Sequence, residues 1–163
     1  MGYRQTTSSF LETAVFSYLT ARDSTSLVGS SRQLLTRSWW ERRADFELYV
    51  SEVVIRECRD GDTLAAARRM EALDGIPLLS LTQHAAELAA LMLSEGIMPA
   101  KAAEDALHIA IAAVHKVDFL LSWNFKHIAN PVLQAKIAAK LQAVGLALPF
   151  ICPPEELLGE DDD

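Results

Sequence analysis

Short apolar runs alternate along this chain with longer segments in which apolar residues recur at helical spacing. The runs lie at residues 8–11, 46–50, 76–81, 118–122 and 148–152, and the helical segments lie at 14–19, 24–43, 52–60, 63–73, 83–95, 103–114 and 133–144. Strands that alternate with helices typically form parallel sheets, because each helix returns the chain to the start of the next strand. The pattern therefore predicts an α/β domain with a mainly parallel sheet.

The chain has 163 residues, which is the size of one ordinary domain. Half of the residues are apolar and 23% are charged, as in typical globular proteins, so the composition argues against disorder. We expect a single domain over residues 1–159 and an acidic tail over 160–163. No run approaches the roughly 20 apolar residues of a membrane span, and the first residues lack the apolar core of a signal peptide. We therefore expect a cytoplasmic protein with no membrane partner.

The charge is unevenly distributed. The formal net charge is −7, but six of the 22 acidic residues lie in the last nine positions, so the rest of the chain is nearly neutral. The net charge therefore does not exclude a nucleic-acid partner. Basic residues that are candidates for phosphate contacts are Arg22, Arg32, Arg37, Arg42, Arg43 and Lys126. Arginines on amphipathic helices are also typical of plain solvated faces, and that alternative stays open for each of them.

Two carboxylates occupy positions where a charge is costly unless it is paired, solvated or bound to a cation. Glu12 directly follows the first predicted strand, and functional crevices of parallel sheets lie beyond the carboxyl ends of the strands. The alternative for Glu12 is an exposed glutamate in a turn. Asp105 shares a helix face with His108 and Ile109, at the edge of a buried stripe. We expect His108 to be a hydrogen-bonded histidine of the core rather than a metal ligand.

Glu57 is the third candidate acid. It lies about two turns into the helix that follows the second strand, near enough to the same sheet edge to join Glu12 and Asp105. Taken alone, Glu57 also fits a solvated helix glutamate that pairs with nearby arginines. Three converging carboxylates repel one another, and a hard divalent cation such as Mg²⁺ or Mn²⁺ stabilises such a group. The trio therefore predicts a metal site.

A fourth candidate, Asn124, follows the strand at 118–122 and offers an amide that can bind a metal or orient a water molecule. Other chemistries find little support in the sequence. The histidines lack the spacing of a zinc site, and the glycines form neither a phosphate-binding loop nor a dinucleotide fingerprint. There is no nucleophile elbow. Kinase, dehydrogenase and serine hydrolase activities are therefore poor candidates.

Six fragments, in this order and spacing, resemble the PIN-domain family, and in particular its VapC-like toxin ribonucleases. The fragments are FLET at 10–13, SYLT at 17–20, VSEVV at 50–54 leading to Glu57, DALHIA at 105–110, LLSWN at 120–124 and KHIAN at 126–130. The resemblance implies a three-layer α/β/α fold whose parallel sheet has about five strands in the order 3-2-1-4-5. It covers most of the chain.

In that family, acidic residues at the carboxyl edge of the sheet bind Mg²⁺ or Mn²⁺. By motif position, the resemblance places Glu12 at the first acid, Glu57 at the second and Asp105 at the third. Asn124 stands where many members have a further aspartate. Two features depart from the family pattern: Glu12 replaces the commoner aspartate, and Asn124 removes a charge that helps to hold a second ion.

The resemblance implies hydrolysis of an RNA phosphodiester by the toxin of a toxin–antitoxin pair. A carboxylate or Asn124 would orient the attacking water, an antitoxin protein would block the pocket, and two copies of the chain would form a homodimer. The alternative is a catalytically weakened PIN-like module that binds nucleic acid or protein, which the residues at positions 12 and 124 favour. A phosphatase would need a nucleophilic aspartate after the first strand, where Glu12 is a poor substitute.

Overall fold

The computed structural model describes residues 7–128 and 130–158, so the predicted tail at 160–163 lies outside the described residues. The strands are β1 Thr7–Leu11, β2 Phe46–Ser51, β3 Leu78–Leu79, β4 Phe119–Leu121 and β5 Phe150–Cys152. The helices are α1 Thr13–Thr20, α2 Leu27–Trp40, α3 Glu52–Arg59, α4 Thr63–Leu73, α5 Gln83–Ser94, α6 Ala103–Val114 and α7 Pro131–Ala143. Short 3₁₀ turns lie at Arg43–Asp45, Ala100–Ala102 and Pro154–Leu157.

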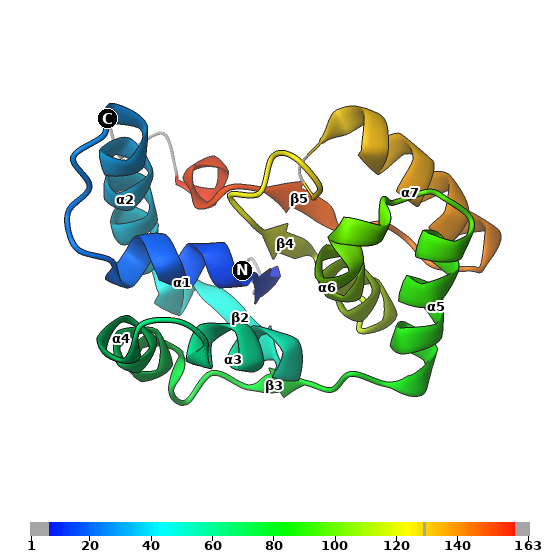
Figure 1. The fold of residues 1–163 in the computed structure, drawn as a ribbon. Coiled ribbons are helices and arrows are strands. Elements are labelled where there is room, and N and C mark those ends of the chain that lie inside the picture. The colour runs from blue at the N-terminus through cyan, green and yellow to red at the C-terminus, as the bar shows by residue number, and fades with distance from the viewer. Residues whose placement is uncertain (1–6, 129, 159–163) are drawn as a thin grey trace, which may run out of the picture.

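The strands form one sheet in the order β3-β2-β1-β4-β5, and each neighbouring pair is parallel. In Figure 1, α1, α2 and α4 lie to one side of the sheet and α5, α6 and α7 to the other. The predicted α/β/α class, the parallel sheet and its strand order are thereby confirmed. The strand at 148–152 was expected at an edge, and β5 takes that place.

Strand β3 is shorter than the predicted run at 76–81, and its sequence explains why. The Ile76 amide donates to the Leu73 carbonyl at 3.1 Å, which closes a turn after α4. Pro77 has no N–H to donate to the ladder, although its carbonyl accepts from the Val50 amide at 3.1 Å. Pairing with β2 therefore continues only through Leu78 and Leu79.

Helix α7 starts two residues before the predicted segment at 133–144. Its N-cap is Asn130, whose side-chain Oδ1 accepts from the amides of Val132 at 3.0 Å and Leu133 at 3.2 Å. Pro131 occupies the first turn, where its missing N–H costs nothing. The prediction of a start at residue 133 was wrong because it followed apolar spacing and passed over this cap.

The cap of α7 leads to a first prediction. Asn130→Ala removes the acceptor for two helix amides and is expected to lower the free energy of unfolding by about 1 kcal/mol. For a chain of this length, that is a drop of about 2–4 °C in the melting temperature. Thermal unfolding measures the change, and Asn130→Asp, which keeps the cap, is the control. Equal melting temperatures for the Ala variant and the unchanged protein would contradict the assignment.

The core lies between the sheet and the helices. Phe10, Leu11 and Leu121 from the central strands are fully buried, as are Ile109 and Ile111 from α6. The two cysteines, Cys58 and Cys152, are free thiols. No helix within the described residues is both long enough and apolar enough to cross a membrane.

Candidate functional site

The register of β1 and β4 places Glu12 beside Ser122. Leu11 pairs with Leu121, and the Glu12 amide continues the ladder by donating to the Leu121 carbonyl at 3.1 Å. Glu12 and Ser122, the residues that follow these two strands, therefore lie next to each other. Ser122 Oγ donates to Glu12 Oε2 at 3.0 Å. Glu12 is only 6% exposed, so it is not the exposed turn glutamate that the sequence left open. Burial raises the pKa of its carboxyl group.

Glu57 contacts His108 from the neighbouring helix α3. His108 Nε2 lies 2.6 Å from Glu57 Oε1, and Thr13 Oγ1 donates to the same oxygen at 2.7 Å. Burial alone would raise the pKa of Glu57, but the contacts with His108 and other donors outweigh it and lower this pKa to about 2. Glu57 is therefore an ionised carboxylate whose Oε1 already contacts two side chains.

His108 is completely buried on α6. Its Nδ1 has no hydrogen-bond partner among the described residues. Burial alone would lower the pKa of the imidazole, but Glu57, Glu12 and Asp105 outweigh that effect and raise it. The prediction that His108 is buried in the core is confirmed, and the neighbouring acids favour the protonated form of its imidazole.

Asp105 lies one helical turn before His108 and is half-buried. Burial raises the pKa of its carboxyl group, against the opposing effects of His108, of a hydrogen bond with Asn124 and of His127. Asn124 Oδ1 accepts from the backbone amides of Lys126 at 3.2 Å and His127 at 3.1 Å. Because the oxygen is occupied by this turn, the amide nitrogen of Asn124 is the group that donates to Asp105.

The structure therefore brings all four predicted residues into one cluster at the carboxyl edge of the sheet. His108 interacts electrostatically with each of the three acids, and Asn124 is bonded to Asp105. Three carboxyl groups therefore surround one imidazole. Oxygen donors gathered at the end of a parallel sheet have the chemical character of a cation site.

The side chains are of the type that a hard divalent cation prefers, because they offer carboxylate oxygens. In the described part of the chain, no three side chains of His, Cys, Asp or Glu are grouped so that they could hold one ion together. Mg²⁺ usually keeps several waters and takes only one or two carboxylates from the protein. Glu12 and Asp105 supply oxygen donors of that kind, whereas Glu57 Oε1 is shared by His108 and Thr13.

Sequence reasoning missed several polar residues of the cluster. Ser122 accepts from the Asn124 amide at 2.9 Å and also donates to Glu12. A hydrogen bond with Glu57 raises the pKa of the Glu104 carboxyl group. His127 lies close enough to lower the pKa of Asp105. The sequence held one signal for the position of His127. Asn124 lies three residues before it, and the side-chain oxygen of asparagine often accepts from the backbone amides of a turn that follows it.

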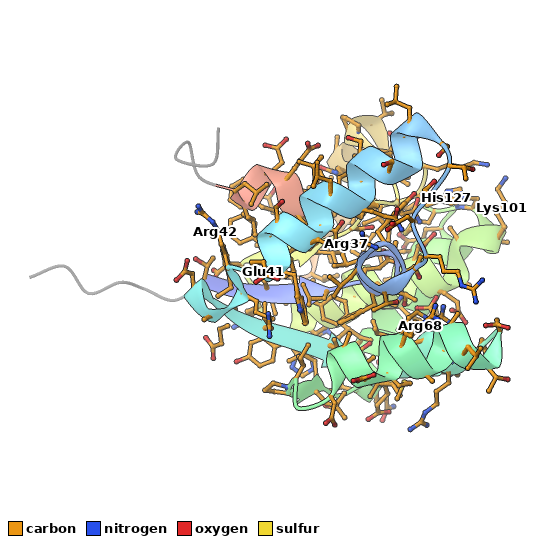
Figure 2. The ribbon with its side chains drawn as sticks, turned by 90° about the vertical axis from the view of Figure 1, so that its left-hand side faces the viewer. Arg37, Glu41, Arg42, Arg68, Lys101 and His127 are labelled. Atoms are coloured by element: carbon orange, nitrogen blue, oxygen red, sulfur yellow. The ribbon has the colours of Figure 1, made fainter. Side chains whose placement is uncertain are left out.

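Basic side chains lie at both ends of the molecule. Figure 2 shows His127 and Lys101 together at one end and Arg42 toward the other. Arg37 was a candidate for phosphate contact, but it pairs with Asp23 at 3.0 Å and donates to the Ala21 carbonyl at 3.0 Å. Its role in the structure is to tie α2 to the end of α1.

The parallel sheet and its flanking helices define a three-layer α/β/α fold, with an acidic cluster at one edge of the sheet. Among solved structures, one match is VapC20 of Mycobacterium tuberculosis, described as a toxin that cleaves the sarcin-ricin loop. It has a TM-score of 0.57 and 17% identity, over 76% of this chain and 95% of that one. A second is VapBC2 of Rickettsia felis bound to a DNA fragment from its promoter, with a TM-score of 0.54, 14% identity, and coverage of 76% and 93%.

At these identities the likeness concerns the fold, and at that level the resemblance to VapC-like PIN domains is confirmed. In comparisons by sequence, no protein-family model matches the chain, and no curated protein matches it significantly. The activity must therefore be argued from the site itself.

Proposed function

We propose that this protein is a metal-dependent ribonuclease of the VapC-like toxin type, which hydrolyses RNA phosphodiester bonds. The observation that carries the proposal is the acidic cluster, in which buried Glu12 and half-buried Asp105 lie with Glu57 around one histidine. The fold also supports the proposal, since one solved structure with this fold is the toxin VapC20 and another is a VapBC2 assembly.

Glu12 and Asp105 are the residues we expect to hold Mg²⁺ or Mn²⁺, with Glu57 as the third acid. Once bound, the cation would supply Lewis-acid stabilisation of the phosphoryl charge and make water more acidic. Glu12 is held for this role by Ser122, whose hydroxyl donates to Oε2.

The remaining groups orient the acids and handle the proton. His108 keeps Glu57 ionised, and Asn124 fixes the Asp105 carboxyl through its amide nitrogen. We assign a carboxylate oxygen of Asp105 to orient the attacking water and accept its proton, because Asp105 is half-buried and is held by its hydrogen bond with Asn124. Asn124 then acts on the water through Asp105, as a positioning residue.

The partners follow from the same proposal. The substrate is RNA, and the protein acts in the cytoplasm as a homodimer. A cognate antitoxin blocks the acidic pocket, as a basic side chain placed among three carboxylates would do. The solved VapBC2 assembly supports an antitoxin partner.

Cleavage of a mixed pool of single-stranded and structured RNA tests the proposal. Purified protein is expected to cut RNA in Mn²⁺ or Mg²⁺ and to stop when EDTA is added. The same ions should raise its melting temperature, because they bind the folded state only. A folded protein that neither cuts RNA nor gains stability in any metal would contradict the proposal and favour a PIN-like binding module.

A further inference from the structure

Next to the acidic cluster, a guanidinium group is enclosed by aromatic rings from separate parts of the chain. Arg32 on α2 lies 5.8 Å from the ring centroid of Tyr18, 5.4 Å from that of Trp123 and 5.2 Å from that of Phe125. Its Nη1 also donates to the Tyr18 hydroxyl at 3.1 Å. Rings at this distance attract a cation and restrict where it can move.

Arg32 has donors to spare. A guanidinium carries five N–H groups, and one of them is bonded within the described residues. No carboxylate there lies within ion-pair distance of Arg32, in contrast to Arg37 on the same helix, which pairs with Asp23. A positioned cation with unused donors and no acidic partner is suited to an external anion.

Trp123 and Phe125 differ in their exposure to solvent. Trp123 is 5% exposed and is fixed by its indole N–H, which donates to Thr36 Oγ1 at 2.8 Å. Thr36 in turn donates to the Arg32 carbonyl at 2.6 Å. Phe125 is 43% exposed and meets Trp123 edge-on, with an angle of 75° between the rings. Phe125 is therefore an aromatic surface open to solvent on a rigid support.

Arg32, Trp123 and Phe125 line a pocket of about 360 Å³, together with apolar residues of α2. That volume is at the low end of the roughly 300–1,000 Å³ of ligand sites, which suits a single nucleotide. Glu155 lines the same pocket and can accept from the amino group of a base. An exposed ring, a guanidinium and a carboxylate together match an unpaired nucleotide, which has an aromatic face, a phosphate and N–H donors.

We propose that Phe125 and Arg32 bind one unpaired nucleotide of the RNA, with the base stacked on Phe125 and its phosphate bonded to Arg32. The location supports this, because Phe125 directly follows Asn124, which is bonded to Asp105. The inference rests on the proposed ribonuclease function for the identity of the ligand. It makes the substrate a single-stranded or looped segment of RNA rather than a continuous duplex.

Binding is measured with Asp105→Asn protein in EDTA, so that cleavage does not interfere. The probes are a short fluorescent single-stranded RNA and the same RNA with abasic nucleotides. Phe125→Leu is expected to weaken binding of the intact RNA by about 10-fold or more, because stacking is lost, and to leave binding of the abasic RNA unchanged. Phe125→Tyr, which keeps a ring, should restore binding of the intact RNA.

Arg32→Gln is expected to weaken binding of both RNAs, since the phosphate is common to them. Arg59→Gln, at the C-terminal end of α3, is the control for the loss of one positive charge and should change neither. Thermal unfolding of each variant verifies that it is folded. For Arg32, Arg32→Lys is the second variant: it keeps the charge and should recover part of the binding.

The outcomes separate the two proposals. If the unchanged protein cleaves RNA but Phe125→Leu binds intact RNA as tightly as before, the nucleotide site is wrong and the ribonuclease stands. Equal losses for intact and abasic RNA also overturn the site. If binding of intact RNA depends on Phe125 while no metal supports cleavage, the nucleotide site stands and the ribonuclease is wrong.

Discussion

Replacing Asp105 with asparagine is expected to reduce the rate of RNA cleavage by about 100-fold or more. The amide cannot accept the proton of the attacking water, and it is a much weaker ligand for a hard cation. The fold should survive, because burial already penalises the charge of Asp105 and an amide of the same size removes that penalty. The variant should therefore be at least as stable as the unchanged protein in EDTA, and it should gain less stability from Mn²⁺.

Single-turnover cleavage and thermal unfolding with and without Mn²⁺ measure both effects. Asp60→Asn is the matched control, because Asp60 is exposed at the C-terminal end of α3 and the same substitution there should alter neither value. Glu12→Gln provides a second variant within the cluster, and its loss of activity should be of similar size. Cleavage that persists at the original rate in both variants would show that these acids are not the site.

The sequence predicts where the site residues lie in the fold better than it predicts the contacts between them. An acidic residue directly after the apolar run at 8–11 was enough to place Glu12 at a carboxyl edge, since a parallel sheet puts all such ends on one side. Asp105 followed from its position on the stripe of a buried helix. Both arguments need only the period of an element and the direction of a strand.

The contacts between elements were beyond such reasoning. Whether Glu57 faced solvent or the cluster depended on how α3 sits against α6, and the periodicity of either helix says nothing of that. The same holds for Asn124, whose amide was expected to bind a metal or orient a water molecule. The side-chain oxygen of Asn124 accepts from the backbone amides of Lys126 and His127, so the side-chain nitrogen is the group left to donate to Asp105.

His108→Ala is expected to have the largest effect on stability, lowering the free energy of unfolding by about 3–5 kcal/mol when metal is absent. The substitution removes the positive charge that faces Glu12, Glu57 and Asp105, and it leaves a cavity in a fully buried position. At about 2–4 °C for each kcal/mol, the melting temperature should fall by roughly 10 °C. Thermal unfolding in EDTA measures this, with His84→Ala on the exposed side of α5 as the control.

The pH dependence distinguishes lost charge from lost packing. The folded-state pKa of His108 is raised, so its pairing stabilises the fold fully below the ordinary value of 6.5 and is lost as the pH rises through the raised value. The pKa of Glu57 is lowered from 4.5 to about 2, so its share is present above 4.5 and is lost as the pH falls toward 2. The difference between His108→Ala and the unchanged protein should therefore be largest between pH 4.5 and 6.5.

The same variant also tests whether His108 and a cation neutralise the same charges. With the imidazolium gone, the three acids have no positive partner at the centre of the cluster, so an added divalent ion should stabilise His108→Ala by more degrees than it stabilises the unchanged protein. A constant destabilisation from pH 5 to 9, together with an equal response to Mn²⁺, would mean that His108 contributes through packing alone. The assignment of a positive charge to His108 in the folded protein would then be wrong.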